Sequence, residues 1–464
     1  MVRVAHDRER GEEGEDETVF QGWLPVYGTS LEIIAYEIPL DDILQDPQII
    51  RGARVSTGRD TKAVEEKADG MINFLWRDKH VTPIQQIQVR TRHVTPMPYG
   101  RPFFRLFATH NEQSGRYSVN EDRYYTPPVG REAMEIMELS EREARYMYKL
   151  ALEAGVSKEQ ARLLLLYRFT SKFYMTISLR HIMEFLSMQQ VPGRHDTTQF
   201  YDIQSLYRQI VQDWMPWAFA AWEKSPSFVN FDWIPEVLKA VRPITSIAPW
   251  RTSKVLDKGY VKFHSPFGLE EYMLAALDDF PDPRNAFGHG SMLFTLKAPI
   301  HVMRQWLRHR NGHWTEPREQ FDRIVEENDF YVPKRFQSQV GKVGHYEFKD
   351  LPESASEHLL ILYRDYIEQM RRHYRDLRRL GVPEEVAGMN LPFCFYTIAG
   401  WTVPIDGLMN FLSLRADSHA QWEIQQYAAV IWAFFQESFP RSAKLFARYL
   451  HYGDAPYITA LAKG

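Results

Sequence analysis

Two separate stretches carry side chains whose types could do chemistry. The first, residues 304–310, reads RQWLRHR, so His309 lies between Arg308 and Arg310. A guanidinium group binds phosphate oxygens through paired hydrogen bonds, and two such groups beside an imidazole suit a phosphate or a polyanionic cofactor. The alternative is a solvated basic face that binds nothing.

The second stretch, residues 110–118, reads HNEQSGRYS. It holds an amide, a carboxylate, a hydroxyl, a flexible glycine and a guanidinium within six residues, which are Asn111, Glu112, Ser114, Gly115 and Arg116. Such a set can contact a small polar ligand from several sides. A surface turn is the alternative.

Length and composition limit the class of protein. A chain of 464 residues is long for one core and favours two domains. Its net charge of -4 gives no electrostatic reason to bind a nucleic-acid polymer, and no apolar run approaches the roughly 20 residues of a membrane span. Residues 1–18 form a charged tail that we expect to be disordered and that is not a signal peptide, so the sequence predicts a soluble cytoplasmic protein.

Periodicity predicts a mixture of helices and strands. Apolar residues at helical spacing indicate helices over residues 41–56, 61–78, 132–154 and 353–380, and the last two end at Gly155 and Gly381. Alternating patterns indicate strands within residues 20–40, 86–94 and 294–302.

The chain repeats itself in register. Residues 155–162 resemble residues 381–388, and at the same offset residues 183–188 resemble residues 409–414. Two matches in one register indicate a tandem duplication. We therefore expect the tail, residues 1–18, to be followed by one domain over residues 19–240 and a second over residues 241–464.

These motifs resemble the flavin-dependent thymidylate synthases, in which an Arg-His-Arg triplet precedes an Asn-Glu-x-Ser-x-Arg-Tyr segment. Here the triplet stands at residues 308–310 and the second segment at residues 111–117, in different copies. Residues 411–424 are similar to the C-terminal signature of the family. The resemblance implies an α+β protein of two fused domains, each a small, mostly antiparallel sheet packed with long helices.

Each active site in that family lies between subunits, and its two sides come from different chains. Carried over residue by residue, the second copy keeps the flavin side: Gln305, Arg308, His309, Arg310, Asn410, Arg415 and His419. The first copy keeps the nucleotide side: Glu112, Ser114, Gly115, Arg116 and Arg162. The resemblance also implies that Ser56, Thr82, Asn111 and Glu112 lie near the flavin, and that Gln305 contacts the nucleotide.

The losses in the two copies are complementary. Where the second copy has Gln305, the triplet and Arg415, the first has Pro102, Leu106, Phe107 and Gln189. Where the first copy has Ser114, Arg116 and Arg162, the second has Arg318, Gln320 and Gly388. Random decay would affect both sides alike, so we predict one surviving composite site per chain.

On the family pattern, the chain would be a methyltransferase that binds FAD and turns dUMP into dTMP, with NADPH and methylenetetrahydrofolate as co-substrates. Arg415, Arg116 and Ser114 would act at the reacting nucleotide, and two chains would form a homodimer that mimics the tetramer of the family. The single cysteine, Cys394, lies in an apolar run typical of an inert core thiol, so it is not expected to be the nucleophile.

Other interpretations stay open. His309, His313 and Glu316 have spacing that would suit a metal on a helix, but Gly312 and Pro317 argue against a helix there, and no metal is predicted. The chain could also be a catalytically dead flavin- or nucleotide-binding partner. A third possibility is another C5 transfer, such as methylation or hydroxymethylation of UMP or dCMP.

One further expectation concerns the C-terminal signature. Ser418 and Gln421 have the spacing of a capping box, which would place Arg415 and His419 at the start of a helix. A helix start adds free N–H groups and its dipole to an anion site.

Overall fold

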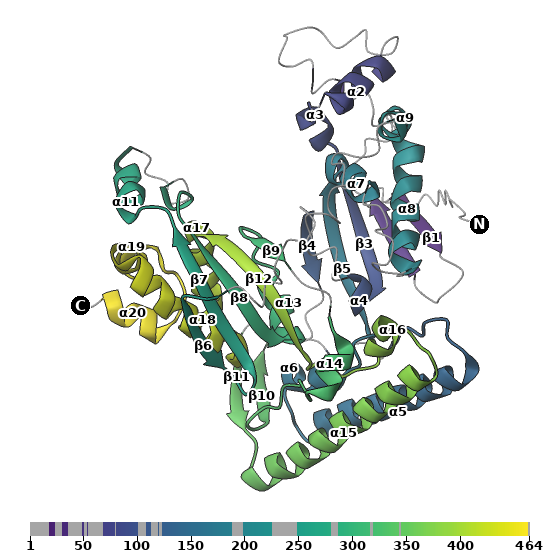
Figure 1. Cartoon of the computed structure of the whole chain (residues 1–464), viewed down its shortest axis with the longest axis vertical. Coiled ribbons are helices and arrows are strands. Elements are labelled where there is room, and N and C mark those ends of the chain that lie inside the picture. The colour runs from purple at the N-terminus through teal and green to yellow at the C-terminus, as the bar shows by residue number, and fades with distance from the viewer. Residues whose placement is uncertain are drawn as a thin grey trace. The chain divides into compact units, whose positions relative to one another are not determined.

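A computed structural model gives the fold of the chain (Figure 1). The structure describes residues 18–23, 30–35, 49, 50, 53, 68–78, 80–100, 108–112, 119, 123–187, 198–224, 248–279, 286–315, 319–342 and 345–462. Residues 1–17 of the expected tail, and most of the helix expected over residues 41–56, lie outside this set. None of the helices in the described segments is long and apolar enough to cross a membrane.

Packing divides the chain into two compact units. Unit 1 comprises Met1–Gln113, Arg123–Thr126 and Arg168–Ala240, and unit 2 comprises Ser114–Asp122, Pro127–Tyr167 and Val241–Gly464. The units are defined by packing and the sequence copies by order along the chain. Residues 127–167 of the first copy therefore lie in unit 2.

Unit 1 contains two small antiparallel sheets, with strand orders β1-β2 and β3-β5-β4. Its strands are β1 (Thr18–Trp23), β2 (Ser30–Ala35), β3 (Gln88–Pro96), β4 (Ala108–Glu112) and β5 (Thr170–Ser178). Its helices are α2 (Ala68–Arg77), α3 (Thr82–Gln85), α4 (Met97–Gly100), α7 (Leu179–Leu186), α8 (Thr198–Trp214) and α9 (Pro216–Lys224).

Unit 2 is built on a five-stranded antiparallel sheet of order β6-β7-β8-β12-β9 and a hairpin, β10-β11. The strands are β6 (Arg251–Val255), β7 (Gly259–Phe267), β8 (Ser291–Pro299), β9 (His313–Thr315), β10 (Gln337–Lys342), β11 (His345–Asp350) and β12 (Tyr396–Pro404). The helices are α5 (Arg131–Glu153), α6 (Lys158–Ala161), α11 (Glu270–Asp279), α13 (Ile300–Trp306), α14 (Phe321–Glu326), α15 (Glu353–Arg379), α16 (Glu384–Gly388), α17 (Ile405–Arg415), α18 (Trp422–Ser438), α19 (Pro440–Leu445) and α20 (Pro456–Ala462), with single turns at Arg162–Leu164 and Phe446–Leu450.

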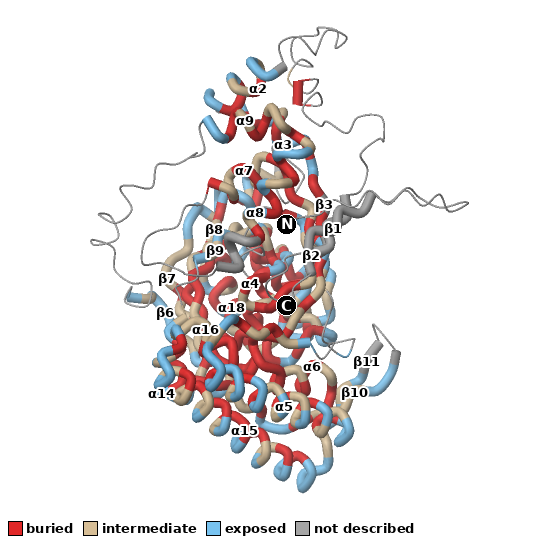
Figure 2. Tube along the Cα trace, turned by 90° about the vertical axis from the view of Figure 1, so that its right-hand side faces the viewer, coloured by how far each residue is buried: buried red, intermediate tan, exposed pale blue. Residues whose placement is uncertain are grey.

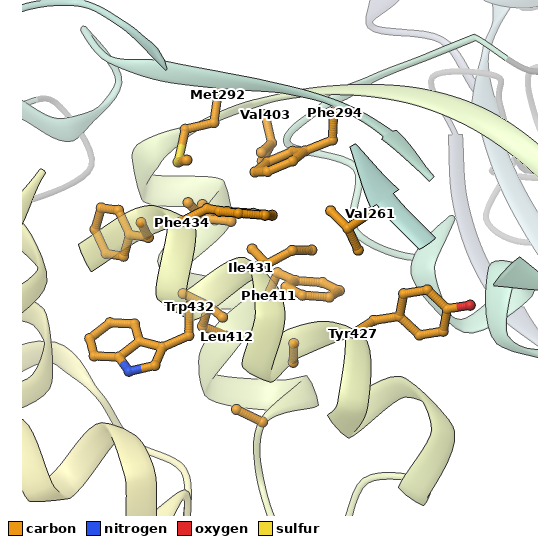
Figure 3. Packing of buried hydrophobic residues seen from close by; sticks show 14 of the residues in the cluster. Val261, Met292, Phe294, Val403, Phe411, Leu412, Tyr427, Ile431, Trp432 and Phe434 are labelled. Atoms are coloured by element: carbon orange, nitrogen blue, oxygen red, sulfur yellow. The ribbon is translucent and has the colours of Figure 1, made fainter. Parts of the chain in front are cut away.

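The core of unit 2 lies between its sheet and helices α17 and α18. Apolar side chains of β7, β8 and β12 meet apolar side chains of these two helices, as Figure 3 shows for Phe294, Val403 and Phe411. Ile431 and Tyr427 of α18 are fully buried in the same cluster. This core fixes the ends of α13 and α17, from which most of the candidate site residues extend.

The duplication is visible in strand pairing. In unit 1, β3 pairs with β5 from Gln88↔Ser178 to Pro96↔Thr170, and in unit 2 β8 pairs with β12 from Ser291↔Pro404 to Pro299↔Tyr396. Both pairs have the same register, and a short strand, β4 or β9, continues each sheet in the same position. The two copies therefore fold by the same plan.

The long helices of the two copies pack against each other inside unit 2. Helices α5 and α15 run side by side (Figure 1), and buried and exposed residues alternate along both (Figure 2). Each ends at a glycine with a left-handed backbone, Gly155 (φ 82°) and Gly381 (φ 81°). The helices and C-terminal glycines expected from the sequence are confirmed.

Equivalent residues of the two copies also form reciprocal backbone hydrogen bonds. The Tyr167 amide donates to the Leu391 carbonyl at 2.8 Å, and the Phe393 amide donates to the Leu165 carbonyl at 2.7 Å. A contact in which each partner makes the same bond to the other is the signature of a two-fold interface. Within unit 2, this segment of the first copy therefore meets the second copy as two subunits of a dimer would.

The α+β class with small antiparallel sheets is confirmed, but one expected strand is too long. Residues 300–302 were assigned to a strand, whereas they begin α13, because Pro299 ends β8 and lies at the N-cap. A short apolar run does not distinguish a strand from a buried helix by its pattern alone. Residues 20–23 and 30–35 do form strands, as expected.

Tyr366→Phe tests the contact between copies. The Tyr366 hydroxyl, buried on α15, donates to the Leu164 carbonyl at 2.7 Å. Its removal leaves a buried carbonyl unsatisfied, so the free energy of unfolding should fall by about 1–3 kcal/mol in a denaturant titration. Tyr146→Phe, on the exposed side of α5, should change it by less than about 0.5 kcal/mol. Equal effects of the two variants would contradict this role of Tyr366.

Candidate active site

Helix α13 and the loop that follows it position the Arg-His-Arg triplet. Trp306 is fully buried and stacks on Phe411 with ring centroids 5.0 Å apart, which anchors the last turn of the helix. The helix ends there, and Arg308, His309 and Arg310 follow in an irregular loop. Gln305 lies half-buried in the last helical turn.

His309 and Arg415 form the first contact of the site. His309 is buried, and its Nε2 accepts a hydrogen bond from Arg415 Nε at 2.8 Å. Arg415, at the end of α17, also donates from Nη2 to the Gln305 carbonyl at 3.2 Å. Burial, with the charges of Arg415 and Arg308, holds the pKa of His309 well below its usual value. A neutral ring keeps the lone pair that orients Arg415.

Gln421 forms the second contact and joins the two copies. Its Oε1 accepts from Gln305 Nε2 at 2.6 Å and from Arg162 Nη2 at 2.7 Å. Arg162 belongs to the first copy and also donates from Nε to the Glu159 carbonyl at 3.3 Å. All of these residues lie in unit 2. The structure thus brings together Arg162, Gln305, His309 and Arg415 within one chain.

One buried polar atom of this cluster, Gln305 Oε1, has no hydrogen-bond partner among the described residues. Rotating the Gln421 amide would place its NH2 group against two other donors, which fixes its orientation. Hydrogen bonding from Gln421 also lowers the pKa of the buried Glu423, against the larger raising effect of burial. A buried acceptor without a partner is costly unless a ligand or water satisfies it.

The two arginines of the triplet supply positive charge beside this cluster. Arg308 is exposed and Arg310 half-buried. Burial, with the like charge of Arg308, lowers the pKa of Arg310 below its usual value. Two guanidinium groups that repel each other are stabilised by a bound polyanion, so the donor set fits the phosphates of a flavin dinucleotide.

The expected capping box at Ser418 is wrong. Helix α18 begins at Trp422, and Gln421 is its N-cap residue without a side-chain capping bond. Ser418 Oγ instead donates to Asp454 Oδ2 at 3.0 Å, and Arg415 ends α17 rather than starting a helix. The side chain of Gln421 is used by Arg162 and Gln305, which is why it does not cap.

Two other flavin-side residues lie apart from the hydrogen-bonded cluster. His419 is exposed and its Nδ1 lies 2.9 Å from Asp417 Oδ1. Asn410 is exposed on α17 and accepts a hydrogen bond from the Tyr452 hydroxyl. Neither is bonded directly to Arg415 or Gln421 by these contacts.

The remaining predicted residues lie in unit 1 or outside the described residues. Thr82 is exposed at the start of α3, and Asn111 is exposed on β4. Glu112, also on β4, accepts a hydrogen bond from Ser171 Oγ at 2.7 Å. Ser56, Ser114, Gly115 and Arg116 lie outside the described residues.

Unit 2 also holds a cavity of about 230 Å³, whose lining includes the two residues that follow Gln421 in the sequence. Its lining includes Glu159 and Gln160 of the first copy, and Tyr331, Trp422 and Glu423 of the second. Both carboxyl groups are buried, and burial together with Glu159 raises the pKa of Glu423. The Tyr331 hydroxyl donates to Glu423 Oε1 at 3.0 Å.

The equivalent position in the second copy is closed. Gly388 stands where the first copy has Arg162, and a Cβ placed there would lie 2.4 Å from the ring of Phe321. Phe321 is buried and packs edge-on against Phe395, with centroids 5.5 Å apart. An arginine therefore has no room at position 388 without displacement of the Phe321 ring.

A metal site at His309, His313 and Glu316 has no structural basis in the described segments. The helix that would align the first two ends at Trp306, and His313 lies on strand β9. No group of three or more His, Cys, Asp or Glu side chains in the described part of the chain could hold a metal ion. Glu316 itself lies outside that part.

The sequence reasoning missed Gln421 as a residue of the site. It lies in the C-terminal signature that was singled out, between Arg415 and the start of α18. The signal was available, since a buried amide next to such a signature can bind a polar group as well as cap a helix. Its partner Arg162 is 259 positions away in sequence, and only the fold brings them together.

Gly388→Ala tests whether the second copy is closed. The new Cβ would press on the Phe321 ring in a filled core, so the free energy of unfolding should fall by about 1–3 kcal/mol. Gly70→Ala, in helix α2 with nothing within 4 Å of the new Cβ, should cause no loss. Denaturant titrations compare the two, and a Gly388→Ala protein as stable as the parent would show that the ring yields.

His309→Gln tests the neutral imidazole. A depressed folded-state pKa means that the unfolded chain binds the extra proton near pH 6.5, so stability from His309 is full above that pH and is lost as pH falls below it. One pH unit below 6.5, the stability difference between parent and variant should have shrunk by about 1.4 kcal/mol. Denaturant titrations across this range provide the measurement. A difference independent of pH would show that His309 titrates normally.

Known proteins match this chain in two segments, as the tandem duplication predicts. The family described as Thymidylate synthase complementing protein matches two segments, residues 42–217 and 282–441. Among similar proteins, the flavin-dependent thymidylate synthase of Thermotoga neapolitana is 35% identical over 220 residues, covering 43% of this chain and 96% of that protein. The one from Thermosipho africanus is 40% identical over 168 residues, covering 36% of this chain and 73% of that protein.

A solved structure is also similar over part of the chain. It is a UMP/dUMP methylase, PolB from Streptomyces cacaoi, bound with 5-Br dUMP, at 23% identity and a TM-score of 0.36, covering 39% of this chain and 90% of that one. The family match spans most of the chain in two segments, and the relative from Thermotoga is covered almost whole. The chain belongs to the flavin-dependent thymidylate synthase family, as a member that carries its domain twice.

Proposed function

We propose that the chain is a working flavin-dependent thymidylate synthase that methylates C5 of dUMP to give dTMP. The observation that carries this proposal is the cluster in which Gln421 accepts hydrogen bonds from Arg162 of the first copy and from Gln305 of the second. The Gln305 carbonyl in turn accepts from Arg415. Family members assemble this combination from two subunits.

Nucleotide binding would rest on arginines from both copies. Arg162 would bind the phosphate of dUMP together with Arg116, which the family pattern places on the same side. Arg415 would lie against the pyrimidine. A guanidinium aimed at a ring oxygen stabilises the negative charge that develops when C5 reacts, and it acts more strongly where water is excluded.

Flavin binding would rest on the triplet. Arg308 and Arg310 would hold the phosphates of FAD, and His419 and Asn410 are further contacts implied by the family pattern. When bound, the reduced flavin supplies the hydride, with methylenetetrahydrofolate as carbon donor and NADPH as electron source. His309 would keep Arg415 in place, since its buried lone pair accepts from the Arg415 Nε.

The properties of Cys394 support a mechanism without a cysteine nucleophile. The thiol is fully buried, and burial raises its pKa to about 12. A neutral thiol is a poor nucleophile at physiological pH. The orientation and charge supplied by the arginines would therefore act on cofactor chemistry.

The proposal includes one flavin per chain and a homodimer. Reciprocal hydrogen bonds between equivalent residues of the two copies make the pair resemble a family dimer, so two chains would form a pseudo-tetramer. The closed position at Gly388 supports a single nucleotide site per chain.

The test is an activity assay with purified protein, FAD, NADPH and methylenetetrahydrofolate. Release of tritium from C5-labelled dUMP, with dTMP as product, is the expected result, and flavin titration should saturate near one FAD per chain. Parallel assays with UMP and dCMP, and the product mass, separate other C5 transfers. A protein that binds flavin and nucleotide but releases no tritium from any of the three would be a dead partner.

Arg162→Ala tests the contribution of the first copy. Loss of a guanidinium bonded to phosphate should weaken dUMP binding by about ten- to a hundredfold, because hydrogen bonds to charged groups contribute about 1.5–3 kcal/mol. Calorimetric titration with dUMP provides the measurement. Arg131→Ala, a change at an exposed arginine on α5, should leave the affinity unchanged. Binding by the Arg162 variant equal to that of the parent would remove Arg162 from the nucleotide site.

A further inference from the structure

We propose that Gln421 is a positioning residue of the nucleotide site, where it sets both the place and the charge of Arg162. This inference rests on the proposed function, because it assumes that Arg162 binds the phosphate of a nucleotide. No motif assigned Gln421 this role, and the sequence alone assigned it to a helix cap.

The first step is geometric. Gln421 is fully buried and lies at the N-cap of α18, so its backbone is fixed by the helix that follows. Its single Oε1 accepts from both Arg162 and Gln305, at 2.7 and 2.6 Å. One acceptor thus holds a side chain of each copy, and neither can shift without straining the bond to the other.

The second step concerns charge. An arginine held by a carboxylate has its charge compensated, as for Arg378, whose Nε lies 3.1 Å from Asp322 Oδ1 in the same unit. The Gln421 amide gives Arg162 an acceptor and adds no negative charge. Arg162 is therefore oriented by this contact without being neutralised by it, which suits an arginine that must bind an anion.

The third step concerns the donor end of the same amide. Gln421 Nε2 is buried, and hydrogen bonding from the Gln421 side chain lowers the pKa of the buried Glu423, against the larger raising effect of burial. The oxygen of the amide accepts from Arg162 and Gln305. The amide is therefore held in one orientation by groups at both of its ends.

The test compares two variants that separate orientation from charge. Gln421→Glu keeps an acceptor oxygen for Arg162 and Gln305 but adds a buried negative charge. Gln421→Met keeps the volume and removes the acceptor. Gln426→Glu, on the same helix and bonded only weakly to the Trp422 carbonyl at 3.4 Å, is the matched control.

We expect Gln421→Glu to lower the affinity for dUMP by about ten- to a hundredfold, because the new carboxylate pairs with Arg162. Its melting temperature should fall less than that of Gln421→Met, because an acceptor for Arg162 and Gln305 remains. The affinity of Gln421→Glu for deoxyuridine, which lacks the phosphate, should change by less than about threefold on the same scale. Gln421→Met should lose both melting temperature and dUMP affinity. Gln426→Glu should behave as the parent does.

A merely structural role gives a different result. It predicts that Gln421→Glu, which retains the acceptor, rescues both stability and dUMP binding, and this outcome would overturn the inference. Equal losses for dUMP and deoxyuridine would also overturn it. If the parent binds no dUMP, the proposed function fails first, and the variants are then compared with inorganic phosphate as the probe. Phosphate binding by the parent that Gln421→Glu weakens supports the role of Gln421, and unaltered or absent binding refutes it.

Discussion

The antiparallel bridge between residues 165–167 and residues 391–393 is the contact on which the rest of unit 2 depends. Its two hydrogen bonds join equivalent positions, so each copy makes the same backbone contact with the other. The two hydrogen bonds hold the turn that follows α6 against the second copy. They also fix the position of α16, which precedes residues 391–393. Where residues 127–167 of the first copy meet their equivalents in the second copy, the backbone plan is shared and the side chains differ.

The difference is sharpest at the pair Arg162 and Gly388. In the first copy the side chain reaches Gln421, and in the second the absence of a side chain lets the Phe321 ring fill the space. Asp322, next to Phe321, accepts from Tyr374 and Arg378 of α15, which fastens this segment to the long helix. The second copy thus has apolar packing and an ion pair where the first copy has a side chain that reaches Gln421.

Much of this could be predicted from the sequence, for physical reasons. Apolar residues at helical spacing over more than twenty residues, followed by Gly155 or Gly381, are a strong local signal for a helix. The spacing gives the helix one buried face, and the glycine can adopt the left-handed backbone that commonly ends a helix. Each half of the family signature is a short run of neighbouring residues, so the sequence alone shows which half stands in which copy. The end of β8 was not, since residues 300–302 are apolar and suit a strand or a buried helix equally.

The site itself depended on information that no local pattern holds. Ser418 and Gln421 have the spacing of a capping box. The Ser418 hydroxyl instead donates to Asp454, which lies beyond the end of α18, and Gln421 accepts from Arg162 of the first copy. The Gln421 side chain can serve either as a cap or as an acceptor for Arg162, which is half-buried. It serves as the acceptor, because a partly buried guanidinium without an acceptor costs more than an uncapped helix end.

The same principle explains the acceptors at this site. The contacts of Arg162 include an amide oxygen, and those of Arg415 include a neutral imidazole and a backbone carbonyl. Arg378 of the same unit is bonded to the carboxylate of Asp322. A neutral acceptor fixes the direction of a guanidinium without adding a negative charge, whereas a carboxylate also compensates the charge. The proposed nucleotide site would depend on this difference, because it needs arginines that are both oriented and charged.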